Sequence, residues 1–274
     1  MLELPEALVV AGQIDKVLKG KRLVKVEAGH TPHGFAFYQG NPQLYPGMLE
    51  GLRLDRTEQS GGRVELFLED MRLTLQDGVN VRYLAPGAKR PERHQLLLEF
   101  EDGGGLSCTI QMYGGIMAFP AGQNDNFYYV VTKQRPSPLS DQFDGAYFAA
   151  LWEGCKPNLS AKAFLATEQR IPGLGNGCLQ DILFRAKIHP KRKLETMGEA
   201  ERDRLFRSLK DTLREMAEQG GRDTEKDLFG ESGRYQTYLS AKTWKGVCPV
   251  CGGPITRQAY LGGNVYFCAH CQAL

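Results

Sequence analysis

The sequence has no apolar run long enough to cross a membrane, and its first twenty residues lack the apolar core of a signal peptide. It also lacks a dominant charge, because 34 Lys and Arg stand against 32 Asp and Glu. With 42% hydrophobic residues, the composition is that of an ordinary globular protein. These absences argue against a membrane or exported protein, and the 274 residues suffice for two domains. We therefore expect a cytoplasmic protein.

Seven cysteines fall into two groups. Cys108, Cys155 and Cys178 are scattered among apolar or small residues, which is typical of buried thiols in a reducing compartment. The other four form two C-x2-C pairs separated by sixteen residues: Cys248, Cys251, Cys268 and Cys271. Four thiolates at this spacing suit a closed tetrahedral metal site. We expect one structural zinc ion per chain, which stabilises a C-terminal hairpin too small for its own core.

A glycine-rich turn stands in the second half of the chain. Gly173, Gly175 and Gly177 permit successive backbone N–H groups to converge. Asn176 adds an amide donor at the point where the apolar spacing of residues 179–183 predicts that a helix begins. Such a helix N-terminus is an anion site. Two helices packed closely for structural reasons also need small residues, so the glycines alone leave both interpretations open.

The region around this turn is basic. Lys and Arg outnumber Asp and Glu between positions 156 and 214, and Lys191-Arg192-Lys193 follows the predicted helix. On its own such a run is typical of a solvated helical face. Next to a phosphate-holding turn, it indicates a surface for the backbone of duplex DNA.

A resemblance to a known family lies in this same region. It is carried by Lys162, Glu168-Gln169, the turn Gly173-Leu174-Gly175-Asn176, and Ile188-His189-Pro190. Together they resemble the helix-two-turn-helix of the formamidopyrimidine-DNA glycosylase and endonuclease VIII family. In that family the Gly-Asn turn and a lysine about one helix earlier hold the phosphates that flank a damaged nucleotide. The resemblance therefore implies that Lys162, Gly175 and Asn176 bind DNA.

The N-terminus resembles the same family. There a proline at position 2 becomes the terminal amine that attacks C1′ of the sugar, and the following glutamate handles protons. Glu3 and Glu6 match this pattern, so the resemblance implies that both are catalytic. Position 2, however, is Leu2, which leaves Met1 as the candidate amine nucleophile, one residue away from the attack position. Without catalysis, the two glutamates would simply favour the dipole of the first helical turn.

The DNA-contacting strands resemble the family less closely. Tyr113-Gly114 stands at the family's Phe-Gly step, whereas Gln111-Met112 replaces an arginine that fills the gap left by an extruded nucleotide. The family's Met-bearing wedge loop is replaced by residues 76–80. Arg63 lies beside the position of a hairpin lysine, and Asn264 lies beside the position of an arginine in the zinc hairpin. The resemblance leaves Arg63, Tyr113 and Asn264 as DNA contacts.

Hydrophobic spacing predicts an α+β protein. An N-terminal helix is predicted over residues 2–18, with one apolar face formed by Leu4, Leu8, Ala11, Ile14 and Leu18. A β-sandwich or barrel is predicted over residues 21–133, where Gly61-Gly62 and Asp77-Gly78 mark hairpins. Four helices are predicted after it, at Phe143–Trp152, Ala161–Glu168, Asn176–Ala186 and Glu199–Gln219. The expected domains are a β-sandwich at 1–134, a hinge at 135–142, a helix-two-turn-helix domain at 143–235, and a zinc hairpin at 236–274.

Three further segments carry weaker signals. His30 and His33 are spaced for a metal or acid/base pair, although two partly exposed loop histidines are the commoner arrangement. The run Phe127–Thr132 is predicted as a strand whose aromatic residues pack into a β core, with base stacking as the alternative. The segment Gly220–Tyr235 is long and unpatterned, and we expect it to be mobile.

Two functions are consistent with these features. The first is a monomeric base-excision enzyme, a DNA glycosylase with or without lyase activity, in which Glu3 assists attack by water or by a rearranged Met1 amine. The second is a non-catalytic protein that binds damaged, abasic or distorted duplex DNA. The absent proline favours the second, and the surviving glutamates favour the first. An RNA or protein adaptor that uses the zinc hairpin is a third possibility, which leaves the Gly-Asn turn unused.

Overall fold

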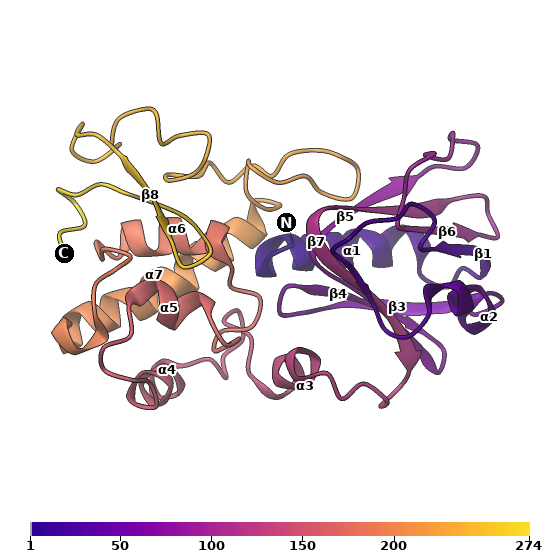
Figure 1. Ribbon diagram of the computed structural model, residues 1–274, viewed down its shortest axis with the longest axis horizontal. Coiled ribbons are helices and arrows are strands. Elements are labelled where there is room, and N and C mark those ends of the chain that lie inside the picture. Colours follow the sequence, from indigo (N-terminus) through magenta and orange to yellow (C-terminus); the bar gives the residue numbers. More distant parts are fainter. Residues whose placement is uncertain (1) are drawn as a thin grey trace.

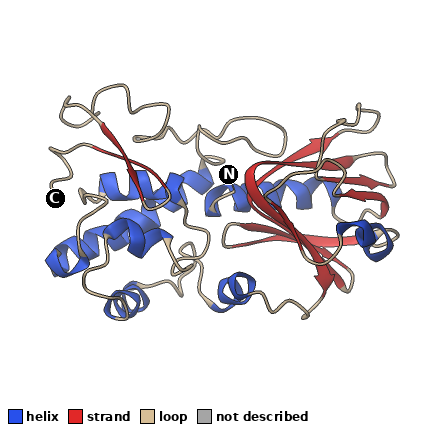
Figure 2. Ribbon diagram, viewed as in Figure 1, coloured by secondary structure: helices blue, strands red, loops and turns tan. Residues whose placement is uncertain are grey.

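The computed structural model describes residues 2–274 and has two halves (Figure 1). One half contains a seven-stranded sheet and α1 (Leu4–Leu18), and the other contains helices and a two-stranded hairpin. The start of α1 lies between the halves, so the first residues of the chain reach their junction (Figure 2). Met1, the candidate amine, lies outside the described residues. No helix within residues 2–274 is long and apolar enough to cross a membrane.

The first half is built on one strongly bent sheet. In hydrogen-bonded order its strands are β1 (Leu23–Ala28), β6 (Leu96–Phe100), β7 (Gly105–Pro120), β5 (Met71–Leu84), β4 (Arg63–Leu68) and β3 (Leu54–Ser60), and β2 (Ala36–Tyr38) pairs with β7 in parallel. The register of β5 against β7 shifts between Asp77 and Val79. Asp77-Gly78 is therefore a bulge inside β5, and the hairpin turn expected there is wrong. A side chain at Gly78 would lie 2.3 Å from the carbonyl oxygen of Tyr113, so the bulge requires glycine.

Helix α1 packs against β3 and β4. Its buried positions include Ala7, Val10, Ala11 and Ile14, whereas Leu8 is 40% exposed. The predicted apolar stripe is therefore correct except at Leu8, whose place is taken by Val10. The short helix α2 (Tyr45–Leu49), which follows η1 (Pro42–Leu44), adds Tyr45 and Leu49 to the core of this half.

The second half consists of four helices around a separate apolar core, with a short hairpin on top (Figure 1). The helices are α4 (Gly145–Glu153), α5 (Ala161–Ala166), α6 (Asn176–Arg185) and α7 (Glu199–Glu218), joined in part by η2 (Leu194–Thr196). The hairpin strands are β8 (Thr256–Tyr260) and β9 (Gly263–Phe267). All four predicted helices are present, and the α+β prediction is confirmed.

The run that starts at Phe127 is not a strand. It forms α3 (Phe127–Gln134), which begins where the Asn126 side chain accepts a hydrogen bond from the amide of Tyr128. Asn126 thus caps the helix and overrides the β preference of the aromatic and β-branched residues. Phe127 and Tyr128 are exposed, so the expectation that they pack into a β core is also wrong.

The segment 220–235 is fixed to both halves, contrary to the expected mobility. Leu228 is buried in the core of the first half, and its carbonyl accepts a hydrogen bond from the amide of Tyr83 in β5. The side chain of Gln13 in α1 contacts both Leu228 and Asp227. The segment was predicted as mobile because its anchoring contacts are far away in sequence, where a local pattern cannot show them.

Candidate nucleic-acid interface

A pocket of about 440 Å³ lies between the two halves. The first half lines it with Arg63, Gln76, Asp77, Met112 and Tyr113, the second half with Lys162, the turn 173–176 and the hairpin tip 261–263, and the N-terminus with Leu2 and Glu3. The structure thus brings most of the predicted DNA-contacting positions to one cavity. Glu6 is buried and does not line this cavity, and Asn264 follows the hairpin residues that do.

Backbone contacts pin the N-terminal segment across the junction. The amide of Leu2 donates to the carbonyl of Asp77 at 2.7 Å, and the amide of Leu4 donates to the carbonyl of Gly173 at 2.8 Å. Gly173 has a φ of +82°, and a side chain there would lie 2.3 Å from the backbone of Gly61. The halves therefore meet backbone to backbone, and glycine is required at this point of closest approach.

The anion held at the N-terminus of α6 is the carboxylate of Glu3. Its oxygens accept hydrogen bonds from the amides of Gly175 at 3.1 Å, Gly177 at 2.8 Å and Cys178 at 2.8 Å. Arg222 approaches the same carboxylate at 3.3 Å. Burial raises the pKa of Glu3, but the charge of Arg222 and the amide donors outweigh burial and hold this pKa below its ordinary value.

This geometry corrects the expected use of the turn. The amide of Gly175 was predicted to hold a DNA phosphate, yet its hydrogen bond goes to Glu3. A side chain on Gly175 would lie 2.6 Å from the Glu3 carboxyl carbon, and one on Gly177 would lie 1.6 Å from an Arg222 nitrogen. The glycines make room for an internal ion pair, so the turn is an anion site whose ligand belongs to the chain itself.

Glu6 and Arg222 complete a buried charged cluster. Arg222 donates from Nε and Nη2 to the two carboxylate oxygens of Glu6, at 2.9 and 2.8 Å. Arg222 is 2% exposed, and both glutamates are at most 5% exposed. The sequence analysis missed Arg222, because a single arginine in a glycine-rich segment carries no pattern. The one available signal was that two glutamates buried at the start of a helix need a cation.

The predicted phosphate donors Lys162 and Asn176 contact the hairpin. Lys162 donates to the carbonyl of Tyr260 at 2.5 Å, and its burial lowers the pKa of its ammonium group. Asn176 donates from Nδ2 to the carbonyl of Asn264 at 2.9 Å, while its buried Oδ1 has no hydrogen-bond partner. Asn264 therefore acts here through its backbone carbonyl and not through its side chain. Because an ammonium group has three donors and an amide nitrogen two, both side chains can also hold phosphate oxygens.

Arg63 and Tyr113 lie on the opposite wall. The buried guanidinium of Arg63 donates to the carbonyl of Tyr128 at 2.9 Å and to Thr132 at 2.8 Å, which ties α3 to the sheet. Arg63 is thus engaged inside the protein, contrary to the expectation of a free DNA contact. Tyr113 is 42% exposed and faces the pocket, and its pKa is raised by burial and by the charges of Asp77 and Glu3.

Asp77 is a pocket residue that the sequence analysis did not select. It has a φ of +58°, a conformation that L residues rarely adopt, at the bulge of β5. Burial raises the pKa of its carboxyl, and the positive charge of Arg63 opposes that shift. The Asp-Gly sequence predicts a turn. In the structure it forms the bulge instead, and the strained aspartate faces the cavity.

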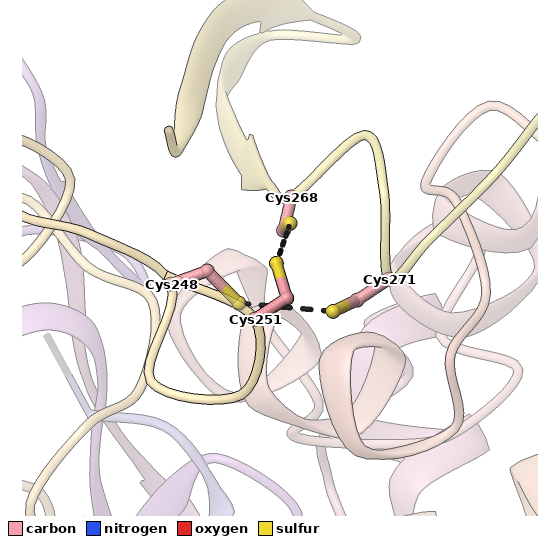
Figure 3. Close-up of side chains that lie close together, drawn as sticks. All are labelled: Cys248, Cys251, Cys268 and Cys271. Atoms are coloured by element: carbon pink, nitrogen blue, oxygen red, sulfur yellow. Dashed lines mark hydrogen bonds between the residues drawn. The ribbon is translucent and has the colours of Figure 1, made fainter. Parts of the chain in front are cut away.

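The four hairpin cysteines converge as their spacing predicts. Figure 3 shows their sulfur atoms directed toward a common centre, with Cys251 and Cys268 at 3.4 Å and Cys248 and Cys271 at 3.8 Å. All four sulfurs lie within 4.8 Å of one another. A tetrahedral zinc ion with Zn–S bonds of about 2.3 Å places its ligands roughly 3.8 Å apart, so the residues fit this metal.

Comparisons with known proteins agree with this architecture. Residues 135–227 match the family model described as the formamidopyrimidine-DNA glycosylase H2TH domain. The formamidopyrimidine-DNA glycosylase of Symbiobacterium thermophilum is 29% identical over 279 residues, which cover 99% of this chain and 89% of that protein. The formamidopyrimidine-DNA glycosylase of Acidiphilium cryptum is 28% identical, and the match covers 99% of this chain and 100% of that protein.

Solved structures show the same fold. The crystal structure of the MutM (Fpg) protein of Thermus thermophilus superimposes with a TM-score of 0.81 at 24% identity and covers 98% of both chains. A complex of Lactococcus lactis Fpg with DNA containing an abasic site gives a TM-score of 0.85 at 23% identity, over 99% of this chain and all of that one.

Fold and site thus define a helix-two-turn-helix protein with a β-sheet half and a four-cysteine hairpin. Residues 135–227 carry the helix-two-turn-helix domain of the formamidopyrimidine-DNA glycosylases, and the chain is similar to members of that family over nearly its whole length.

Proposed function

We propose that this protein acts in DNA repair by binding damaged or abasic duplex DNA in the pocket between its halves. The observation that carries this proposal is the meeting of Lys162, Asn176 and Tyr113 around one cavity of about 440 Å³. Two cationic or amide donors suit the flanking phosphates, and an exposed aromatic ring suits an unstacked nucleotide. The solved complex of a relative with abasic-site DNA supports the same assignment. We further propose that the protein works as a monomer at the nucleoid, in the cytoplasm.

The chemistry is altered from that of the family. In the family an amine at position 2 is the nucleophile, whereas the nitrogen of Leu2 is a backbone amide that donates to Asp77. A peptide nitrogen shares its lone pair with the carbonyl and is not nucleophilic. Glu3 is ionised, buried and bound by four donors, so it is poorly placed to exchange protons. Schiff-base chemistry at these positions therefore has little support.

If the protein cleaves a glycosidic bond, water is the nucleophile and Asp77 is its base. Asp77 is the pocket carboxyl whose pKa is raised, which brings it closer to the pH at which a base works. It would accept a proton from the water that attacks C1′ while the base departs. The alternative, a non-catalytic binder of damaged DNA, is favoured by the complete engagement of Glu3 and Glu6 with Arg222.

Borohydride trapping on abasic-site DNA separates these possibilities. We expect tight binding without a covalent adduct, because Leu2 presents an amide in place of an amine. Single-turnover assays then compare wild type with Asp77→Asn. Loss of base release on substitution supports the hydrolytic enzyme, and absence of release in wild type supports the binder. A trapped adduct at the N-terminus would refute both versions in favour of a lyase.

The hairpin is proposed to hold one structural zinc ion. Cys248, Cys251, Cys268 and Cys271 would supply all four ligands and leave no position open for a substrate. Bound zinc would stabilise the hairpin, whose carbonyls contact Lys162 and Asn176. The metal thus supports the DNA-facing wall of the pocket and takes no part in the reaction.

A further inference from the structure

A second group of metal-ligating side chains lies in the first half. Glu27 stands near the end of β1, His30 follows that strand, and His94 precedes β6. Their ligand atoms all lie within 4.8 Å of one another, and none of the three residues lines the central pocket. Strands β1 and β6 lie at the end of the molecule remote from α4–α7 and from the hairpin β8–β9 (Figure 1). The cluster is therefore separate from both the cysteine hairpin and the DNA site.

The hydrogen bonds of His94 determine which nitrogen is free to bind. Its Nδ1 lies 3.0 Å from the carbonyl of Pro91, which only accepts, so Nδ1 carries the proton. In the neutral ring Nε2 is then an acceptor, yet it faces a carboxylate oxygen of Glu27 at 3.1 Å. Two acceptors at this distance need a positive species between them, either a proton or a metal ion. An N–H to carbonyl bond on the far side of the ring is also what orients histidine ligands in metal sites.

His30 completes a three-ligand arrangement. Its ring stacks on that of His94 with centroids 4.4 Å apart, and its Nδ1 lies 3.9 Å from the same Glu27 oxygen. Neighbouring ligands of a tetrahedral zinc ion are roughly 3.3 Å apart, and a metal ion lies near the plane of each imidazole that binds it. The exposed His30 ring must therefore turn out of its stack on His94 for all three residues to bind one ion. Lys25 pairs with the other oxygen of Glu27 at 2.5 Å and thereby fixes the carboxylate.

The backbone holds this arrangement in place without a metal. The amide of Thr31 donates to the carbonyl of His94, and the Thr31 hydroxyl accepts from the amide of His94. These bonds join the loop after β1 to the segment before β6. His94 is 3% exposed, whereas His30 is 52% exposed, so the site is anchored inside and open to solvent outside. His33 is not part of this cluster, so the His30 and His33 pair that the sequence spacing allowed is not the ligand set.

We propose that Glu27, His30 and His94 bind a divalent transition-metal ion of the zinc type, with a fourth position open to solvent. Two imidazoles and one carboxylate are ligands that such ions prefer, and three protein ligands leave one site for water. This site is independent of the proposed DNA function.

The test is zinc stoichiometry in the full chain with its cysteine site loaded. After zinc addition and gel filtration, we expect two zinc ions per wild-type chain and one per chain in His30→Ala or His94→Gln. His33→Ala is the matched control and keeps two. In a zinc titration, either ligand variant should lose on the order of 100-fold in affinity for the second ion.

Cobalt substitution locates the second ion. Cobalt at the cysteines gives thiolate charge-transfer absorption in every variant, whereas the additional nitrogen- and oxygen-ligated cobalt should be missing in His30→Ala. His30 is exposed, so this variant tests the site even where His94→Gln fails to fold. One zinc per wild-type chain, or a second ion retained equally by His30→Ala, would overturn the proposal and leave His94 and Glu27 as a protonated ion pair.

Discussion

The two ends of the chain meet the same helix, α6, but different chemistry holds them there. At the N-terminus, the buried carboxylates of Glu3 and Glu6 are bound by the buried Arg222, and Glu3 also accepts hydrogen bonds from three backbone amides. At the C-terminus, the hairpin offers neutral carbonyls to Lys162 and Asn176. A fully paired buried charge is costly to disturb, whereas a neutral carbonyl can be joined or replaced by a phosphate. The contrast teaches that the first contact is structural and the second is the one suited to DNA.

The largest expected effect comes from removing metal from the C-terminal end. Structural zinc contributes about 10 kcal/mol or more to the folding of such modules. Chelation should therefore unfold the hairpin β8–β9, while β1–β7 stay folded. NMR spectra of the amides report both halves separately. A hairpin that keeps its dispersed signals without metal would show that its small apolar core suffices.

The N-terminal end is tested by Arg222→Met. Loss of the guanidinium leaves Glu3 and Glu6 buried without their cation, so the free energy of unfolding should fall by about 3–5 kcal/mol. Urea denaturation measures this change. Arg214→Met is the matched control, because Arg214 is exposed and pairs with Asp211 on the surface, and its effect should stay below about 0.5 kcal/mol. Equal effects of the two substitutions would show that the cluster of Glu3, Glu6 and Arg222 does not stabilise the fold.

The pH dependence of stability sharpens the same contrast. The pKa of Glu3 in the folded protein lies below its ordinary value of 4.5. Its contribution is therefore complete above that pH and is lost as the pH falls through the folded pKa. Below pH 4.5, wild type should lose stability more steeply than Glu3→Gln, as measured by urea unfolding. Parallel curves for the two proteins would mean that Glu3 has the same pKa in the folded and unfolded states.

The smallest effect is expected at the C-terminal contact, where Lys162 binds a neutral carbonyl of the hairpin. Lys162→Ala should weaken binding to intact and abasic duplexes alike, by about tenfold, and lower the salt dependence by about one phosphate contact. Fluorescence anisotropy at several salt concentrations measures both quantities. Lys89→Ala, a fully exposed lysine outside the pocket, should leave them unchanged. A loss confined to abasic DNA would instead give Lys162 a role in reading the lesion.

Local patterns in the sequence predicted what local forces determine. The spacing of the four cysteines and the apolar period of α6 gave the hairpin and the helix correctly. The same reasoning failed at Phe127, where a single Asn126 cap turns a β-like run into α3. It failed again at Asp77-Gly78: this dipeptide is typical of a hairpin turn, but the pairing of β5 with β7 makes it a bulge within the strand.

The ligand of the glycine turn could not be predicted because both of its charged partners are remote in sequence. The turn itself was recognised as an anion site, and the structure shows an anion there. That anion is Glu3, more than 170 residues away along the chain, with Arg222 supplied by a segment that has no periodic pattern. Spacing rules describe neighbours along an element, and they carry no information on contacts made when two domains close.

Titration of isotope-labelled protein with an abasic duplex tests the central claim most directly, because NMR resolves the backbone amides of Gly177 and Cys178 from the side-chain amide of Asn176. If Glu3 occupies the N-terminus of α6 permanently, DNA should shift the Asn176 side-chain signals strongly and leave the Gly177 and Cys178 amides nearly unchanged. Large shifts of those two amides, with loss of the Glu3 contact, would contradict the account and return the turn to phosphate binding.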